Sequence, residues 1–338
     1  MSERVVNFPE RLNLETSLEM GRRLMNLEAG HDYTFDFTNL KFVGPFGMVY
    51  VATCIEDAGR RLLPGKLRAR GHQFKGYLAH MGFFRTFGLK HGNRPGEAKG
   101  SFRYIPLSEI DVKEIHQEAA QSGIAIGEFV EERAQRIASV LSQQVEGNLH
   151  DTLAFAIREI LRNAVEHSQS PKVRFCAQYW PKSDRVEVAI LDHGRGVLES
   201  LKVNPYIKCK TDREALHYAL MPGISGTAFK GSKIKGKGVW QNSGFGLYMT
   251  NRICRMGGDF FIGSYKSSLF LKPSIKQTFE FDFPGTVLRL SIRPSEATNL
   301  RSRLLLFSEE GRKIAENLKG AIIEASTASQ MLTVDYRQ

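Results

Sequence analysis

Residues 159–163 read Glu159-Ile-Leu-Arg-Asn163, inside a stretch of helical spacing that we expect to run from Asn148 to His167. Four residues make about one helical turn, so the Glu159 carboxylate and the Asn163 amide project from the same face. An amide oxygen suits the octahedral oxygen shell of Mg²⁺, and a carboxylate can accept a proton from an attacking water or hydroxyl. The same spacing also occurs on solvent-exposed helix faces, so the rest of the chain must decide between these interpretations.

A second motif, Asp192-His-Gly194-Arg-Gly196, directly follows the apolar strand predicted over 185–191. A carboxylate at the end of a strand can accept a hydrogen bond from an exocyclic amine such as that of adenine. The two glycines let the backbone turn tightly and approach a ligand. The alternative interpretation is a turn that only ends the strand.

The third motif is Asn242-Ser-Gly244-Phe-Gly246-Leu247, at the start of a helix expected over 246–256. Glycines before a helix N-terminus expose backbone N–H groups that suit phosphate oxygens, although a simple loop before a helix would look the same. The pattern is neither a Walker A loop nor a dinucleotide-binding fingerprint, because the residues that define those motifs are absent.

A basic loop precedes this third motif. The interval 197–243 is predicted to be mostly loop, and its lysines at 230, 233, 235 and 237 alternate with glycines. Such a loop could close over a triphosphate and exclude water, or it could simply be solvated. Lys237 is our candidate for the phosphate contact because it lies closest in sequence to the Gly244 loop.

Taken in order, these motifs and Pro284-Gly285-Thr286 before a strand resemble the GHKL family. That family includes histidine kinases, anti-sigma serine kinases, gyrase B, Hsp90 and MutL, and it has an ATP-binding α/β sandwich, the Bergerat fold. The resemblance covers roughly residues 125–295 and favours the histidine-kinase and anti-sigma-kinase branch.

The resemblance implies a role for each motif. Asp192 would bind the adenine amine, Asn163 would ligate Mg²⁺, and Glu159 would act as the general base. The other implied cofactor-binding residues are Gly194 and Gly196 around adenine, Gly244, Gly246 and Leu247 over the phosphates, and Thr286 beside the adenine-side water network. The family often has Lys or Arg where this chain has Glu166, so Arg162 or the basic loop would supply that phosphate contact.

The N-terminal region resembles a STAS domain, the fold of anti-anti-sigma factors, over about residues 5–92. The resemblance rests on three segments: 11–16 (RLNLET), 35–43 (FDFTNLKFV) and 81–89 (MGFFRTFGL). Such factors carry a phosphorylatable serine before a helix, where this chain has Gly44-Pro-Phe-Gly47. We therefore expect an interaction module that is not a substrate of its neighbour.

The predicted fold class is α/β, a small STAS-like domain followed by a GHKL sandwich of mixed sheet and helices. We expect a STAS-like domain at 1–95, a linker at 96–124, the ATP-binding domain at 125–295 and a helical tail at 296–338. The spacing of apolar residues also predicts helices over 74–87 and 308–324. It predicts strands over 278–283 and 287–292. His150, on the same helix as Glu159, is expected to face solvent rather than accept phosphate.

Composition narrows the class of protein. The 338 residues carry a net charge of +11, and residues 151–295 hold 22 basic against 12 acidic side chains. A basic surface suits nucleic acid, an acidic partner or a phosphate-bearing ligand. No apolar stretch is long enough to cross a membrane, and no signal peptide is recognisable. The four cysteines form no CxxC pair, so we expect a cytoplasmic protein without a disulfide or zinc scaffold.

Three functions remain open at this point. The first is an Mg²⁺-ATP-binding signalling protein, an ATPase or protein kinase, which regulates a protein partner through the STAS-like domain. A homodimer is one of its open arrangements. The second is an ATP-dependent conformational switch that hydrolyses slowly or not at all. The third, nucleic-acid binding through the basic surface, is supported by charge but by no recognised motif.

Overall fold

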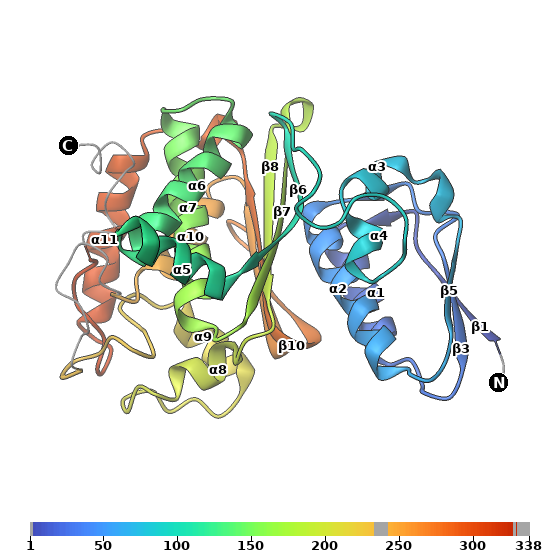
Figure 1. The fold of residues 1–338 in the computed structure, drawn as a ribbon. Coiled ribbons are helices and arrows are strands. Elements are labelled where there is room, and N and C mark those ends of the chain that lie inside the picture. Colours follow the sequence, from blue (N-terminus) through green and yellow to red (C-terminus); the bar gives the residue numbers. More distant parts are fainter. Residues whose placement is uncertain (1–2, 233–242, 327–328, 330–338) are drawn as a thin grey trace. The chain divides into compact units, whose positions relative to one another are not determined.

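The computed structural model describes residues 3–232, 243–326 and 329, which form two compact units. Unit 1 contains residues 1–109 with short segments of two later strands, 174–178 and 187–191, and unit 2 contains residues 110–173, 179–186 and 192–338. Figure 1 shows the helices and strands of both. The observed mixed α/β architecture agrees with the predicted fold class.

Unit 1 begins with a parallel sheet in the order β1-β3-β5, formed by Glu3–Asn7, Asp32–Asp36 and Leu67–Arg70. A second parallel pair joins β2 (Arg11–Leu12) to β4 (Phe42–Val43). Helices α1 (Leu14–Met25) and α2 (Pro45–Arg61) pack against each other. The helix expected over 74–87 is instead two short helices, α3 (Gly76–His80) and α4 (Phe83–Thr86), because Gly82 has φ +87° and breaks the helical path between them.

A five-stranded sheet follows, in the order β6-β7-β8-β10-β9. Its strands are Tyr104–Asp111 (β6), Lys172–Trp180 (β7), Arg185–Asp192 (β8), Asp259–Leu271 (β9) and Lys276–Ile292 (β10). The two strands expected over 278–283 and 287–292 are one strand, β10, which pairs antiparallel with β9. Its register shifts around Phe283 to Thr286, where Pro284 and Gly285 lie, so the turn residues mark a bulge and not a chain reversal.

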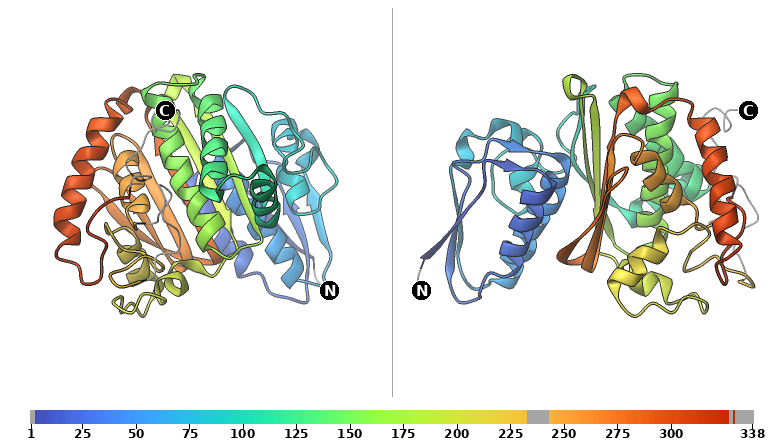
Figure 2. Two further views of the ribbon diagram at one scale, coloured as in Figure 1. Left: turned by 60° about the vertical axis from the view of Figure 1, so that its left-hand side comes forward. Right: turned by 180° about the vertical axis from the view of Figure 1, so that it is seen from behind.

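Figure 2 shows several helices of unit 2 layered on one face of this sheet. They are α6 (Ile126–Ser142), α7 (Asn148–Arg162) and α10 (Gly246–Cys254), with α5 (Val112–Ser122) beside α6. A π-helical turn, Asn163–His167, extends α7. The interval 197–243, predicted to be mostly loop, contains two short helices that the prediction did not include, α8 (Gly196–Leu201) and α9 (Asp212–Ala219). Its other described residues, 202–211 and 220–232, lie outside helices and strands, as predicted. A Thr211–Glu214 capping box starts α9.

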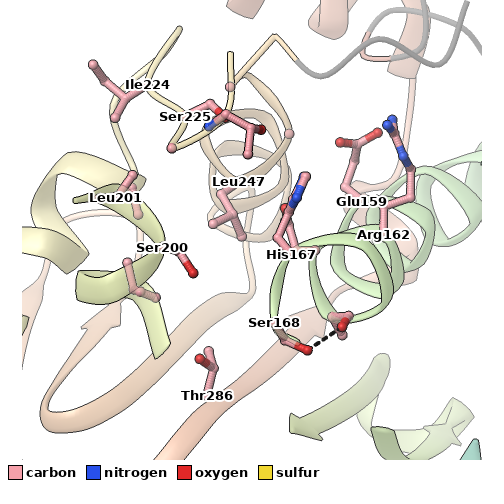
Figure 3. A pocket seen from close by; sticks show the side chains of 18 of the residues that line it. Glu159, Arg162, His167, Ser168, Ser200, Leu201, Ile224, Ser225, Leu247 and Thr286 are labelled. Atoms are coloured by element: carbon pink, nitrogen blue, oxygen red, sulfur yellow. Dashed lines mark hydrogen bonds between the residues drawn. The ribbon is translucent and has the colours of Figure 1, made fainter. Parts of the chain in front are cut away.

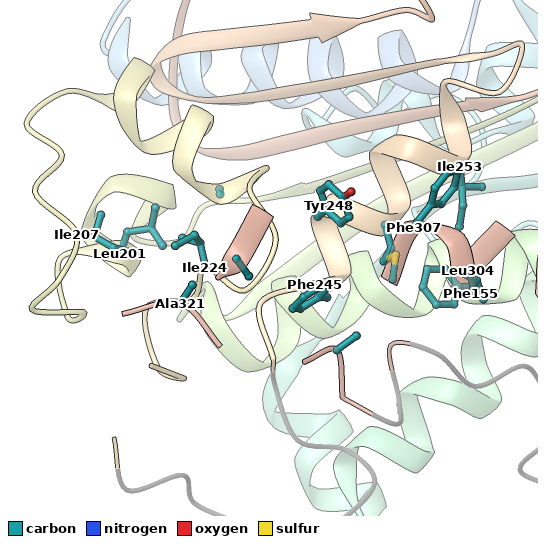
Figure 4. Close-up of a cluster of buried hydrophobic side chains, with 14 of the residues drawn as sticks. Phe155, Leu201, Ile207, Ile224, Phe245, Tyr248, Ile253, Leu304, Phe307 and Ala321 are labelled. Atoms are coloured by element: carbon teal, nitrogen blue, oxygen red, sulfur yellow. The ribbon is translucent and has the colours of Figure 1, made fainter. Parts of the chain in front are cut away.

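The final helix, α11 (Leu300–Ala315), begins and ends several residues earlier than the predicted helix over 308–324, and the two ranges overlap. Its buried stripe consists of Leu300, Leu304, Phe307, Gly311 and Ala315, a helical spacing that the sequence does contain. This stripe belongs to a cluster of buried side chains that also includes Phe155, Leu201, Ile224, Phe245 and Ala321 (Figure 4). Helix α11 and Ala321 are therefore part of the core of unit 2.

Leu304 and Leu305 provide a matched test of this packing, because the first is 1% exposed and the second 54% exposed. We expect Leu304→Ala to lower the free energy of unfolding by about 2–5 kcal/mol, the usual cost of a cavity in a core. The neighbouring Leu305→Ala is expected to change it by less than about 0.5 kcal/mol. Thermal unfolding of both variants checks this, and equal shifts in melting temperature would mean that α11 does not pack as described.

Candidate functional site

One pocket in unit 2 gathers residues from all three sequence motifs (Figure 3). Of the predicted site residues, those that line it are Glu159, Asn163, Asp192, Gly196, Gly244, Gly246, Leu247 and Thr286. Gly194 is not among the lining residues but contacts one of them. Lys237 lies outside the residues that the structure describes. Folding thus brings together segments that are more than a hundred residues apart in sequence.

Asp192 is the last residue of β8, and its side chain is buried at one end of this pocket. The backbone N–H of Gly194 donates to its Oδ1 at 2.8 Å. Burial raises the pKa of the Asp192 carboxyl to about 7, although the Gly194 N–H and the nearby His193 act in the opposite direction. A buried carboxylate that tends to hold a proton gains from a ligand N–H group that stabilises its ionised form.

Tight backbone contacts surround Asp192. A Cβ atom on Gly285 would overlap the Asp192 carbonyl oxygen, so only glycine allows the β10 bulge to approach the end of β8 this closely. Gly196 has φ +75°, and a Cβ there would meet the Tyr265 ring at 2.5 Å. The bulge also places Thr286, whose Oγ1 lies 3.5 Å from Ser264 Oγ, in the pocket wall. The glycines of the second motif therefore serve close packing around the carboxylate, beyond ending a strand.

Glu159 and Asn163 extend from the last turns of α7 into the same pocket. Asn163 begins the π-helical turn, a local widening of the helix that is frequent at functional sites. The Glu159 carboxylate is buried, and its Oε1 accepts a hydrogen bond from Arg158 Nε at 3.1 Å. Two polar side chains one helical turn apart thus face one cavity.

The glycine motif lies beside Glu159. A Cβ on Gly246, the first residue of α10, would overlap Oε2 of Glu159. Among the described residues no side chain caps the N-terminus of α10, so its first N–H groups remain available to an anionic ligand. Gly244 has φ +72°, and a Cβ there would meet the backbone of Ile224 at 2.6 Å. The Glu159 carboxylate therefore lies beside the N-terminus of α10, which is the positive end of its helix dipole.

Glu166, which stands where a basic residue was expected, binds Arg162 through two hydrogen bonds of 3.0 and 3.3 Å. Burial lowers the pKa of Arg162, but the carboxylates of Glu159 and Glu166 more than offset this and raise it above its ordinary value. Arg162 therefore remains a cation in the pocket wall. Arg162 and Arg195 are the arginines among the described residues that line this pocket.

Sequence reasoning missed several other lining residues. Arg195, inside the second motif, donates from Nε to the His167 carbonyl and to Ser200 Oγ, each at 3.1 Å. Ser329 enters the pocket from the C-terminal segment, with its Oγ 3.5 Å from Ser243 Oγ. A serine in a tail without a motif gives no sequence signal, whereas Arg195 could have been inferred from its place between two ligand-approaching glycines.

The donor set indicates how a metal ion would be held here. Groups of three or more His, Cys, Asp or Glu side chains suited to a metal do not occur in the described part of the chain. Mg²⁺ needs few protein ligands when a nucleotide supplies phosphate oxygens, because it retains waters and binds through one or two side chains. Asn163 fits that pattern, while a metal site built from protein carboxylates alone does not.

Comparison with known families bears on this pocket. Residues 148–290 match the family model described as histidine kinase-, DNA gyrase B-, and HSP90-like ATPase. The chain contains a GHKL ATPase domain. The matched range includes every predicted site residue, and the match supports ATP binding by the GHKL domain, which in this family usually involves Mg²⁺. No curated protein matches the chain.

The match confirms the C-terminal part of the predicted fold, and it leaves the STAS-like resemblance and the anti-sigma-kinase branch as hypotheses. Separately, none of the helices formed by the described residues has the length and apolar character needed to cross a bilayer.

Proposed function

We propose that the protein binds Mg²⁺-ATP in the GHKL pocket and transfers the terminal phosphoryl group to water or to a hydroxyl or histidine of a protein partner. The observation that carries this proposal is the juxtaposition of Glu159 with Gly246 at the start of α10, with the buried Asp192 in the same pocket. An acceptor for an exocyclic amine and an anion-binding helix end are the two features that ATP recognition needs.

Each residue then has a distinct task. The ionised Asp192 accepts a hydrogen bond from the adenine amine. The first N–H groups of α10 and the Arg162 side chain bind the phosphates. Mg²⁺, when bound, neutralises triphosphate charge, and Asn163 would help to hold it. Glu159 orients the attacking hydroxyl and accepts its proton, so that catalysis consists mainly of positioning and charge stabilisation.

We propose further that the N-terminal region is a STAS-like module through which nucleotide state reaches the partner. Helix α2 begins at Pro45 with Gly44 as its N-cap residue, so neither position offers a hydroxyl for phosphorylation. Its role is therefore interaction rather than phosphate acceptance. The proposed boundaries of this module are residues 1–95, followed by a linker to residue 124.

A second candidate is a switch that binds ATP and turns it over slowly. The Arg158–Glu159 hydrogen bond favours it, because the guanidinium already occupies Oε1, one of the two oxygens that could accept a proton. ATP would then act through the difference in its affinity for two conformations of the protein.

The two candidates separate in one experiment with Mg²⁺ and γ-labelled ATP on the full chain. We expect Glu159→Gln to retain nucleotide binding and to lower phosphate release or protein labelling by about 100-fold or more, the usual contribution of a general base. Glu199→Gln, an exposed change on the neighbouring α8, is the control and should match the wild type. Binding without turnover in the wild type would establish the switch, and absence of binding would contradict both candidates.

A further inference from the structure

Three buried side chains link helix α6 to Glu159. Arg158 Nη1 donates to Oε2 of Glu131 at 3.2 Å, and Arg158 Nε donates to Oε1 of Glu159 at 3.1 Å. The side chains of Arg158, Glu131 and Glu159 are 1%, 4% and 6% exposed. Glu131 lies on α6, before the residues matched to the GHKL family model.

The bond between Arg158 and Glu159 is unusual for neighbours in a helix, whose side chains point about 100° apart and do not normally face each other. It forms because the long Arg158 side chain is anchored at its far end. Glu131, on the facing helix α6, accepts a hydrogen bond from Nη1, and the guanidinium lies over the Phe155 ring, 4.8 Å from its centroid. Gln135 donates to the other oxygen of Glu131 at 2.8 Å and so fixes that carboxylate in turn.

The network determines which oxygen of Glu159 is left for chemistry. Arg158 occupies Oε1, and Oε2 is the atom that lies against Gly246 at the start of α10. The lining residues of the pocket, all from the described part of the chain, include Glu159 but neither Glu131 nor Arg158. Two residues, Arg158 and Glu159, thus lie between Glu131 and the ligand.

We infer that Glu131 is a positioning residue for the GHKL domain: it shares the charge of Arg158 and thereby aims Oε2 of Glu159 at the hydroxyl that attacks the terminal phosphate. This inference rests on the proposed phosphoryl transfer. Without the Glu131 charge, the guanidinium would interact more strongly with the Glu159 carboxylate. Proton transfer would then slow while the contacts to ATP stayed in place.

The test compares two identical substitutions one position apart on α6, made in the full chain. Glu131→Gln removes the buried charge, and Glu132→Gln removes an exposed one, since the Glu132 side chain is 51% exposed. We expect Glu131→Gln to lower kcat about 10-fold or more with the Kd of ATP within about twofold of the wild type. Glu132→Gln should leave both unchanged.

A second variant guards against a folding defect. Gln135→Leu removes the amide that fixes Glu131 but keeps every charge, and it should lower kcat less, with Kd again unchanged. Parallel losses of kcat, ATP binding and melting temperature would overturn the inference, because they indicate a structural role alone. An unchanged kcat in Glu131→Gln would overturn it as well. Failure of the wild type to bind or turn over ATP would instead refute the proposed function, and this inference with it.

Discussion

Asp192→Asn is expected to weaken ATP binding by about 10- to 100-fold, the value of one hydrogen bond to a charged group in a buried site. In the wild type, Oδ1 already accepts the Gly194 N–H at 2.8 Å, which leaves the second carboxylate oxygen for the ligand amine. Asparagine has only one oxygen. Whichever way the amide turns, its NH₂ group faces either the Gly194 N–H or the ligand amine, and two donors then oppose each other.

The control for this substitution is Asp282→Asn, an exposed residue of β10 whose carboxylate pairs with Lys266. Calorimetric titration of both variants with a non-hydrolysable ATP analogue and Mg²⁺ measures the effect. If Asp192→Asn bound the analogue as tightly as Asp282→Asn, adenine recognition would have to lie elsewhere in the pocket.

The raised pKa of Asp192 adds a pH dependence of definite sign. Below its pKa of about 7 the free carboxyl is mostly protonated, so an incoming amine must first displace that proton. Affinity should therefore rise as pH increases through 7 and level off above it. Adenosine is the appropriate probe because it has no phosphate to titrate, and the pH dependence should disappear in Asp192→Asn.

Much of the candidate site could be predicted because its residues occur in short motifs with fixed spacing. Glu159 and Asn163 are one turn apart on α7, and Asp192 follows a continuous apolar strand. The GHKL resemblance then predicted that these motifs form one site, which local sequence patterns alone do not indicate. The family match bears out the fold that this reasoning predicted, while the role of each residue remains a prediction.

The rest depended on tertiary contacts that leave little trace in local sequence. His150, expected to face solvent, is buried, with its Nδ1 3.1 Å from Asp151 Oδ1. Helix α7 is buried on every side from Thr152 to Arg162. The usual assumption that one face of an amphipathic helix is exposed to solvent therefore does not hold for it. Charged residues on such a helix must find partners inside the protein, which is why Arg158 reaches Glu131.

The C-terminal segment illustrates the same limit. No motif marks it, yet Ile322 N–H donates to the Gly223 carbonyl at 3.0 Å, and Ser329 reaches the pocket wall. Its residues Ala321 and Ala325 belong to a buried cluster with side chains from elements distant in sequence. Local patterns indicate that such residues are buried, but they do not identify what buries them.

Gly246→Ala should have the largest effect on turnover, which we expect to fall by about 100-fold or more, comparable to loss of the general base itself. A Cβ at position 246 would overlap Oε2 of Glu159, and that carboxylate cannot move aside easily because Arg158 holds its other oxygen in a buried network. The added methyl would also cover the first N–H groups of α10. We therefore expect the substitution to weaken the binding of ATP more than the binding of adenosine.

The design of this test follows from what alanine does to a helix. Alanine at the start of α10 favours helix formation over glycine by up to about 1 kcal/mol, so a loss of function cannot be ascribed to a weaker helix. Gly76→Ala, at the first residue of α3 with no heavy atom within 4 Å of the added Cβ, is the matched control and should behave as the wild type. Phosphate release, ATP affinity and adenosine affinity are measured for both. Normal turnover in Gly246→Ala would mean that the Glu159 carboxylate does not act at the start of α10, because the two groups cannot both keep their positions once the methyl is present.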